Sequence, residues 1–86
     1  MTALDILNLD VLLARSVLLR ADYLQAQSRI TDSLARWKSD QGQVPADSDF
    51  EELALAMSRS LSADARYLCT LSFMVRGIIE RAKATA

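Results

Sequence analysis

The sequence predicts an all-α protein, in which two long helices fold back on each other as an antiparallel hairpin that dimerises into a four-helix bundle. Three observations lead to this fold class. Two long stretches contain no proline and are rich in Leu, Ala and Arg, which favour helix. A short segment containing Gly42 and Pro45 separates them. In each stretch, apolar residues recur at steps of three and four residues, which is the period of a helix.

The expected boundaries follow from these signals. We expect a first helix over residues 4–38, a turn over 39–47 and a second helix over 48–83, so that residues 1–86 form a single domain. At 1.5 Å per residue, each helix is roughly 50 Å long. A chain of 86 residues has no room for a second hydrophobic core.

Short motifs define the helix ends more closely. A glycine in the left-handed conformation, followed closely by a proline, is typical of the end of a helix. Gly42 and Pro45 have this pattern, so Gly42 is expected to end the first helix. Ser48 and Glu51 have the spacing of a capping box, which starts the second helix. Serines around Ser60–Ser62 leave an alternative in which the second helix breaks there and the chain forms three helices.

One apolar stripe on each helix is expected to form the seam of the hairpin. The stripe on the first helix, with Ser16 as a gap, comprises Leu12, Leu19, Tyr23, Ala26, Ile30, Leu34 and Trp37. The stripe on the second helix comprises Phe50, Leu53, Met57, Leu61, Ala65, Leu68, Leu71 or Ser72, Val75 and Ile79. Folding the chain at residues 42–45 makes the two stripes antiparallel and brings Leu19 to Leu68.

Further apolar residues lie outside this seam and predict self-association. Two helices alone are marginal in water, and burial of a large aliphatic side chain contributes about 1.5–3 kcal/mol. We therefore expect a homodimer in which two hairpins form a four-helix bundle. The predicted dimer interface is Leu9, Leu13, Val17, Leu24, Tyr67, Leu71, Met74 and Ile78. A three-helix monomer and a heteromer with another helical protein are the alternatives.

A polar pair interrupts this surplus apolar surface. Arg20 lies between Val17 and Leu24 in the sequence, and the antiparallel register brings it close to Asp64. Such a pair at a half-buried position fixes the register of helices at some cost in stability. The alternative is that Arg20 extends its guanidinium into water at the rim of the interface.

The residue inventory argues against most catalytic and metal chemistry. The chain has no histidine and one cysteine, so it lacks a histidine-based active site, a zinc finger and a disulfide scaffold. The acidic residues between Asp47 and Glu52 suit a helix N-terminus and lack the ligand spacing of a calcium loop. No glycine-rich phosphate loop is present. We expect no enzymatic activity, no catalytic residues, no metal and no cofactor.

Four residues of the second helix indicate where another protein binds. Leu55, Arg59, Arg66 and Phe73 share one face of that helix. Apolar side chains around arginines resemble the content of a protein–protein hot spot. Ten basic residues against eleven acidic ones give a net charge of −1, which removes a general attraction to nucleic acid. Binding of RNA or DNA through basic and aromatic side chains is the less favoured alternative.

By elimination, the sequence predicts a small regulator, such as an inhibitor, an anti-activator or an adaptor, that docks a helical face onto a partner protein of unknown identity. A secretion-type chaperone or a subunit of a helical complex is the alternative. The first residues lack the basic and apolar regions of a signal peptide, and residues 4–24 carry too many charges to cross a bilayer. A cytoplasmic protein without membrane contact is therefore expected.

Overall fold

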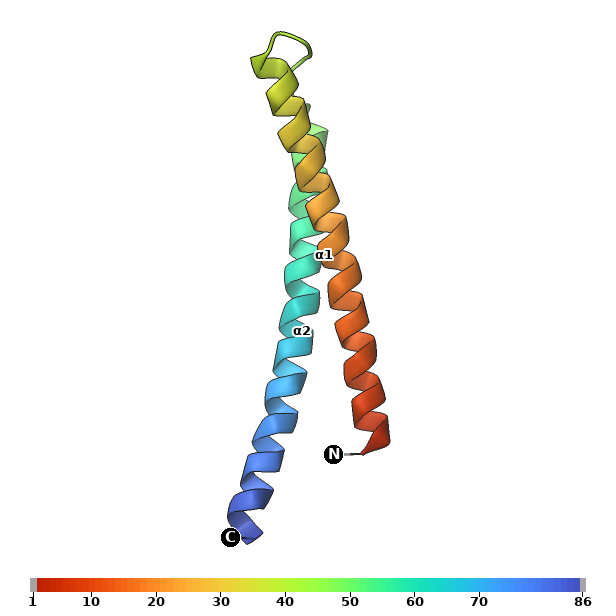
Figure 1. Cartoon of the computed structure of the whole chain (residues 1–86), viewed down its shortest axis with the longest axis vertical. Coiled ribbons are helices and arrows are strands. Elements are labelled where there is room, and N and C mark those ends of the chain that lie inside the picture. Colours follow the sequence, from red (N-terminus) through yellow and green to blue (C-terminus); the bar gives the residue numbers. More distant parts are fainter. Residues whose placement is uncertain (1, 86) are drawn as a thin grey trace.

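The computed structural model describes residues 2–85 as two helices joined by one short connection (Figure 1). Helix α1 spans Ala3–Lys38 and helix α2 spans Asp47–Thr85. They lie side by side and antiparallel, which confirms the predicted all-α hairpin. α2 is continuous, so the alternative with a break near Ser60–Ser62 is wrong. The hairpin is a rod of 68 × 21 × 17 Å.

A capping box that the sequence analysis did not use begins α1. The Thr2 hydroxyl oxygen accepts a hydrogen bond from the Asp5 amide at 3.2 Å, and the Asp5 carboxylate accepts one from the Thr2 amide at 3.0 Å. Both bonds satisfy amides that have no partner within the helix. The bond from the Thr2 amide, and after it the Thr2 side chain, lowers the pKa of the Asp5 carboxyl from its usual value by stabilising the charged form.

Asp40, not Gly42, ends α1 in the left-handed conformation. Asp40 has a φ of 58°, and no glycine has a positive φ. The Gln41 amide donates to the Arg36 carbonyl at 2.9 Å and the Asp40 amide donates to the Trp37 carbonyl at 3.1 Å, which together form a Schellman motif. The prediction for Gly42 is therefore wrong. Aspartate tolerates this conformation better than most residues with a side chain, so the helix ends two residues earlier than glycine alone suggests.

The start of α2 also differs from the predicted capping box. The helix begins at Asp47, which places Ser48 inside the first turn. The Asp49 carboxylate accepts the Ala46 amide at 2.9 Å, so Asp49 takes the position expected for Glu51. Pro45 precedes this turn and is buried. Because proline fixes φ and has no amide to satisfy, it is well placed immediately outside a helix.

On α1, the predicted seam is largely confirmed. Its buried or half-buried residues follow steps of three and four, and the predicted gap at Ser16 is buried. Trp37 is the exception, because it is 45% exposed. The buried and half-buried residues of α1 are Leu9, Leu12, Ser16, Leu19, Tyr23, Ala26, Ile30, Ser33 and Leu34.

On α2, the predicted seam is wrong except at Leu53 and Leu71, which are half-buried. Leu53, Met57, Leu61 and Ala65 are spaced by four residues, so each step advances about 40° beyond a full turn and the stripe drifts around the helix. The observed seam alternates steps of three and four, which keeps it in line with α1. It consists mostly of small residues, which let the two helices approach closely. The seam residues of α2 are Leu53, Ala56, Ser60, Ala63, Tyr67, Thr70, Met74 and Gly77.

The register along the hairpin is shifted from the expected one. Leu19 lines one hollow with Ala63 and Arg66, whereas Leu68 lines another with Leu13. The predicted meeting of Leu19 with Leu68 is therefore wrong. The left-handed residue after α1 is Asp40, ahead of the predicted fold at residues 42–45.

Candidate protein-binding surfaces

A polar cluster joins the two helices near the middle of the rod. The Ser16 hydroxyl and the Arg20 guanidinium, one turn apart on α1, both donate to the Asp64 carboxylate of α2. The Arg20 Nη2 to Asp64 Oδ2 distance is 2.6 Å, and the side chains are 60% and 19% exposed. The expected proximity of Arg20 and Asp64 is confirmed. The Ser16 hydroxyl first, and then Arg20, lowers the pKa of the Asp64 carboxyl.

Large apolar side chains surround this cluster on one side of the hairpin. A hollow of about 510 Å³ is lined by Leu13, Val17, Leu24 and Leu68 as well as by the polar cluster. A second hollow, of about 260 Å³, continues along Leu24, Met57 and Leu61. We define the apolar face as the exposed residues on this side, all of which are between 41% and 61% exposed: Leu13, Val17, Leu24, Met57, Leu61, Leu68, Val75 and Ile78.

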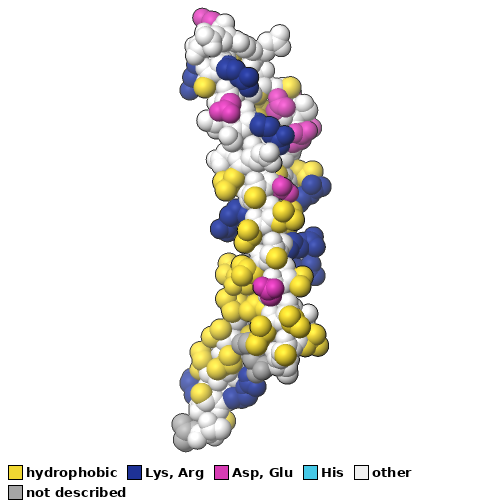
Figure 2. Space-filling model, turned by 45° about the vertical axis from the view of Figure 1, so that its right-hand side comes forward, with side chains coloured by type: hydrophobic (Ala, Val, Ile, Leu, Met, Phe, Trp, Pro, Cys, Tyr) yellow, Lys and Arg dark blue, Asp and Glu magenta, His cyan; other side chains and the backbone are white. Residues whose placement is uncertain are grey.

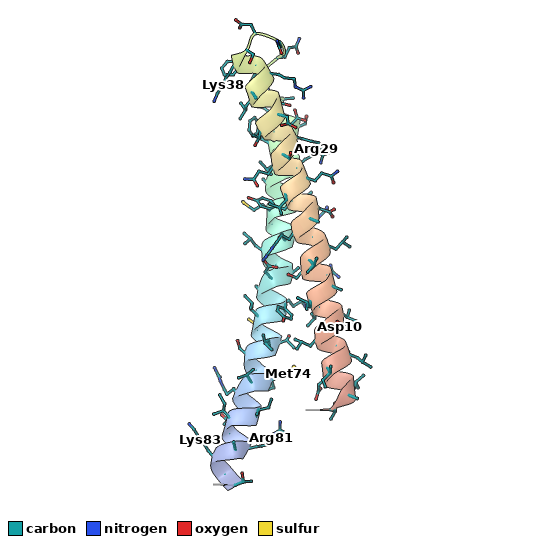
Figure 3. All side chains as sticks on the ribbon, viewed as in Figure 1. Asp10, Arg29, Lys38, Met74, Arg81 and Lys83 are labelled. Atoms are coloured by element: carbon teal, nitrogen blue, oxygen red, sulfur yellow. The ribbon has the colours of Figure 1, made fainter. Side chains whose placement is uncertain are left out.

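Half of the predicted dimer residues are exposed on this apolar face, and the other half pack in or beside the hairpin seam. Leu13, Val17, Leu24 and Ile78 are exposed on it. The other four are half-buried at the edge of the hairpin seam: Leu9, Tyr67, Leu71 and Met74. In Figure 3, Met74 lies between the two ribbons. Sequence reasoning missed Met57, Leu61, Leu68 and Val75, because it assigned them to the seam.

The predicted partner-binding residues lie on the opposite side, and all four are exposed. Arg59 and Arg66 line one hollow of about 250 Å³. Phe73, which is 77% exposed, lines a different hollow near the start of α1, and Leu55 lies farther along α2 toward the turn. The structure thus brings together the two arginines and leaves the two apolar residues on separate turns. It also adds Arg15 of α1 to the hollow, which sequence reasoning missed because that contact depends on the observed register.

Apolar and charged side chains are unevenly distributed along the rod. Figure 2 shows hydrophobic side chains covering much of the lower half, whereas charged side chains of both signs are interspersed toward the turn. Exposed apolar residues also form an outer stripe along α1, which we define as Leu4, Leu7, Val11 and Leu18. Each of these residues is more than 60% exposed.

Neither helix within residues 2–85 combines the length and the apolar character that a bilayer crossing demands. In the same range, no three metal-ligating side chains lie close enough to hold an ion. Comparison of the chain with protein-family models, with curated proteins and with solved structures found no match. The two surfaces therefore have to be interpreted from their own chemistry.

Proposed function

We propose that the chain is a small non-enzymatic protein-binding adaptor or regulator, which pairs with a second copy through the apolar face and presents its opposite side to a partner protein. The observation that supports this proposal is the concentration of large exposed apolar residues on one side of both helices. Contiguous apolar surface of this kind is normally covered in water. Four residues of the predicted dimer interface are exposed on this side: Leu13, Val17, Leu24 and Ile78.

The amount of exposed surface matches what a dimer requires. The chain exposes 6770 Å². A compact monomer of this mass exposes about 5,000 Å², so the excess is on the order of 1,700 Å². A specific interface removes about 800 Å² from each partner, which this excess supplies without any change in the hairpin. No large side chain among residues 2–85 is fully buried, so the hairpin alone lacks a complete core.

The polar cluster supports a second copy as the occupant of this face. Arg20 and Asp64 neutralise each other, so two apolar faces can approach without burying a net charge. A two-fold axis places the same pair from each copy near the centre of a four-helix bundle. There, a polar layer among apolar layers favours one register over others.

Two neighbouring residues allow a sharp test of this interface. Val17 lies on the apolar face and is 61% exposed, whereas Leu18 lies on the outer stripe and is 64% exposed. We expect Val17→Glu to raise the dimer dissociation constant at least a hundredfold, because it buries a charge in the interface. Leu18→Glu has the same charge and similar exposure, and we expect it to leave the dimer intact. Sedimentation equilibrium over a range of concentrations measures both.

The possible outcomes separate the proposal from its alternatives. A monomer at every concentration for the unmodified chain contradicts self-association. Equal weakening by both variants means that association does not use the apolar face. Circular dichroism at 222 nm serves as the control for folding, since a variant that loses helix says nothing about the interface. In that event Val17→Ser, which removes the apolar side chain without adding charge, replaces Val17→Glu.

A further inference from the structure

Three arginines converge on one hollow on the side opposite the apolar face. Arg15 comes from α1, and Arg59 and Arg66 come from α2. The remaining lining residues are Leu19, Ser58, Ser62 and Ala63, so no carboxylate lines this hollow. Its apolar lining residues are Ala63, which is buried, and Leu19, which is half-buried, and Ser58 and Ser62 also line it.

The positive charge in this hollow is not neutralised within the hairpin. Across residues 2–85, the one ion pair within 4.0 Å joins Arg20 to Asp64. Arg15 from α1 and Arg66 from α2 thus line one hollow with like charges, and no carboxylate lines it. Like charges at short range are unfavourable, and an anion between them relieves the repulsion. Since the whole chain has a net charge of −1, the cluster is a local excess of positive charge and not part of a generally basic surface.

We propose that this hollow binds an acidic segment of a partner protein, with a glutamate or aspartate carboxylate held by Arg15, Arg59 and Arg66. Guanidinium groups bind carboxylates through paired, charge-assisted hydrogen bonds. An apolar side chain next to the carboxylate in the partner packs on Leu19 and Ala63. This inference rests on the proposed function insofar as the partner is a protein, but it does not depend on the dimer.

The surroundings of the hollow favour a peptide over a nucleic acid. Nucleic-acid binding depends on neutralising a row of phosphates along an extended basic surface. Here the three arginines line a single hollow of about 250 Å³. Exposed Leu55 and Phe73 lie farther along the same side of α2 and offer apolar contacts that suit a protein.

A synthetic probe tests the site directly. The probe is a short acetylated, fluorescein-labelled peptide in which glutamates flank a leucine, and its matched control carries glutamine in place of each glutamate. Fluorescence anisotropy with the full chain measures the dissociation constants. We expect the glutamate peptide to bind, the glutamine peptide to bind at least tenfold more weakly, and binding of the glutamate peptide to weaken as salt is added.

Variants of the chain show whether the hollow is responsible. Arg15→Gln, Arg59→Gln and Arg66→Gln are each expected to weaken binding about tenfold, since each removes a charge-assisted contact. Arg66→Lys keeps the charge and is expected to restore part of the affinity. Arg36→Gln makes the same change in net charge near the turn, and less than a twofold effect is expected. No binding of the glutamate peptide, or an equal loss in Arg36→Gln, overturns the proposal.

Two further measurements separate this inference from its rivals. A short single-stranded DNA that binds more tightly than the glutamate peptide, and that the same variants release, overturns the inference in favour of phosphate recognition. Sedimentation of the arginine variants is expected to show an unchanged dimer, since the hollow lies away from the apolar face. Peptide binding by a chain that stays monomeric contradicts the proposed dimer and supports the site. A dimer whose peptide affinity is unchanged by all three variants overturns the site alone.

Discussion

The two halves of the hairpin are built differently. The turn half, residues 25–60, buries Ala26, Ile30, Pro45 and Ser60, and it closes α1 with a Schellman motif. The open half, residues 2–24 and 61–85, buries only Ser16 and Ala63. Most of the large exposed apolar residues also lie in the open half, and the two ribbons diverge toward its end (Figure 1).

This difference separates a half that is held together by its own contacts from a half that leaves large apolar side chains exposed. The turn half brings residues close in sequence into contact, so its helices meet without a large loss of chain entropy. The open half brings together residues far apart in the sequence and leaves its large side chains in water. The hairpin is closed at the turn by its own contacts, and its open half exposes the apolar side chains that we propose for association.

We expect the largest effect on the free energy of unfolding when one packed side chain is truncated in each half and the two losses are compared. Ile30 in the turn half is 8% exposed, whereas Leu12 in the open half is half-buried. In dilute, monomeric protein we expect Ile30→Ala to lower the free energy of unfolding by about 2–3 kcal/mol and Leu12→Ala by about 1 kcal/mol. Urea denaturation followed by circular dichroism measures both. Equal losses contradict the view that the turn half carries most of the stability.

A second prediction concerns the close approach of the helices in the open half. Ala63 is 5% exposed and lies in the seam, whereas Ala65 lies on the outer surface of the same helix. We expect Ala63→Leu to destabilise the hairpin by about 1–3 kcal/mol, because the added atoms force α1 and α2 apart. Ala65→Leu adds the same atoms in water, and a change below about 0.5 kcal/mol is expected. Thermal unfolding distinguishes them, and a harmless Ala63→Leu contradicts the observed seam.

The sequence predicted the helical hairpin and the face of α1 that packs against α2, but not the face of α2 that packs against α1. The seam of α1 was predictable because Leu12, Leu19 and Tyr23 are large and keep the three-and-four alternation. The seam of α2 was not, because residues such as Ala56 and Ser60 give little apolar signal beside the bulkier residues of the neighbouring stripe. Helix patterns favour the largest residues, whereas close packing of two helices here uses the smallest.

On the candidate surfaces, too, the features that depend on the sequence pattern of one helix were predictable, and those that depend on the packing of α1 against α2 were not. The proximity of Arg20 and Asp64 was predictable because both interrupt apolar surroundings on their helices. The place of Arg15 beside Arg59 and Arg66 was not predictable, since it depends on the observed register of α1 against α2. The dimer itself and the partner protein remain predictions.

A smaller effect is expected at the turn. Asp40 has a φ of 58°, which glycine adopts at lower cost, so we expect Asp40→Gly to raise the free energy of unfolding by about 0.5 kcal/mol. Gly42 has no positive φ, and an added Cβ meets only the Arg36 Cβ at 3.4 Å. Gly42→Ala is therefore expected to change stability by less than about 0.5 kcal/mol. A larger loss in Gly42→Ala, measured by urea denaturation, contradicts the placement of the helix end at Asp40.

The smallest expected effect concerns the pH dependence of the polar cluster, where the turn and open halves meet. Because the pKa of Asp64 is lowered in the folded state, its contribution to stability is fully present above the unfolded value near 4 and is lost as the pH falls through the folded pKa. The Ser16 hydroxyl is the larger cause, so we expect Ser16→Ala to raise the pKa of Asp64 more than Arg20→Gln does. Carbon-detected NMR titration of the Asp64 carboxyl measures this difference. A larger rise in Arg20→Gln means that the exposed ion pair, and not the hydroxyl between the helices, holds the carboxylate charged.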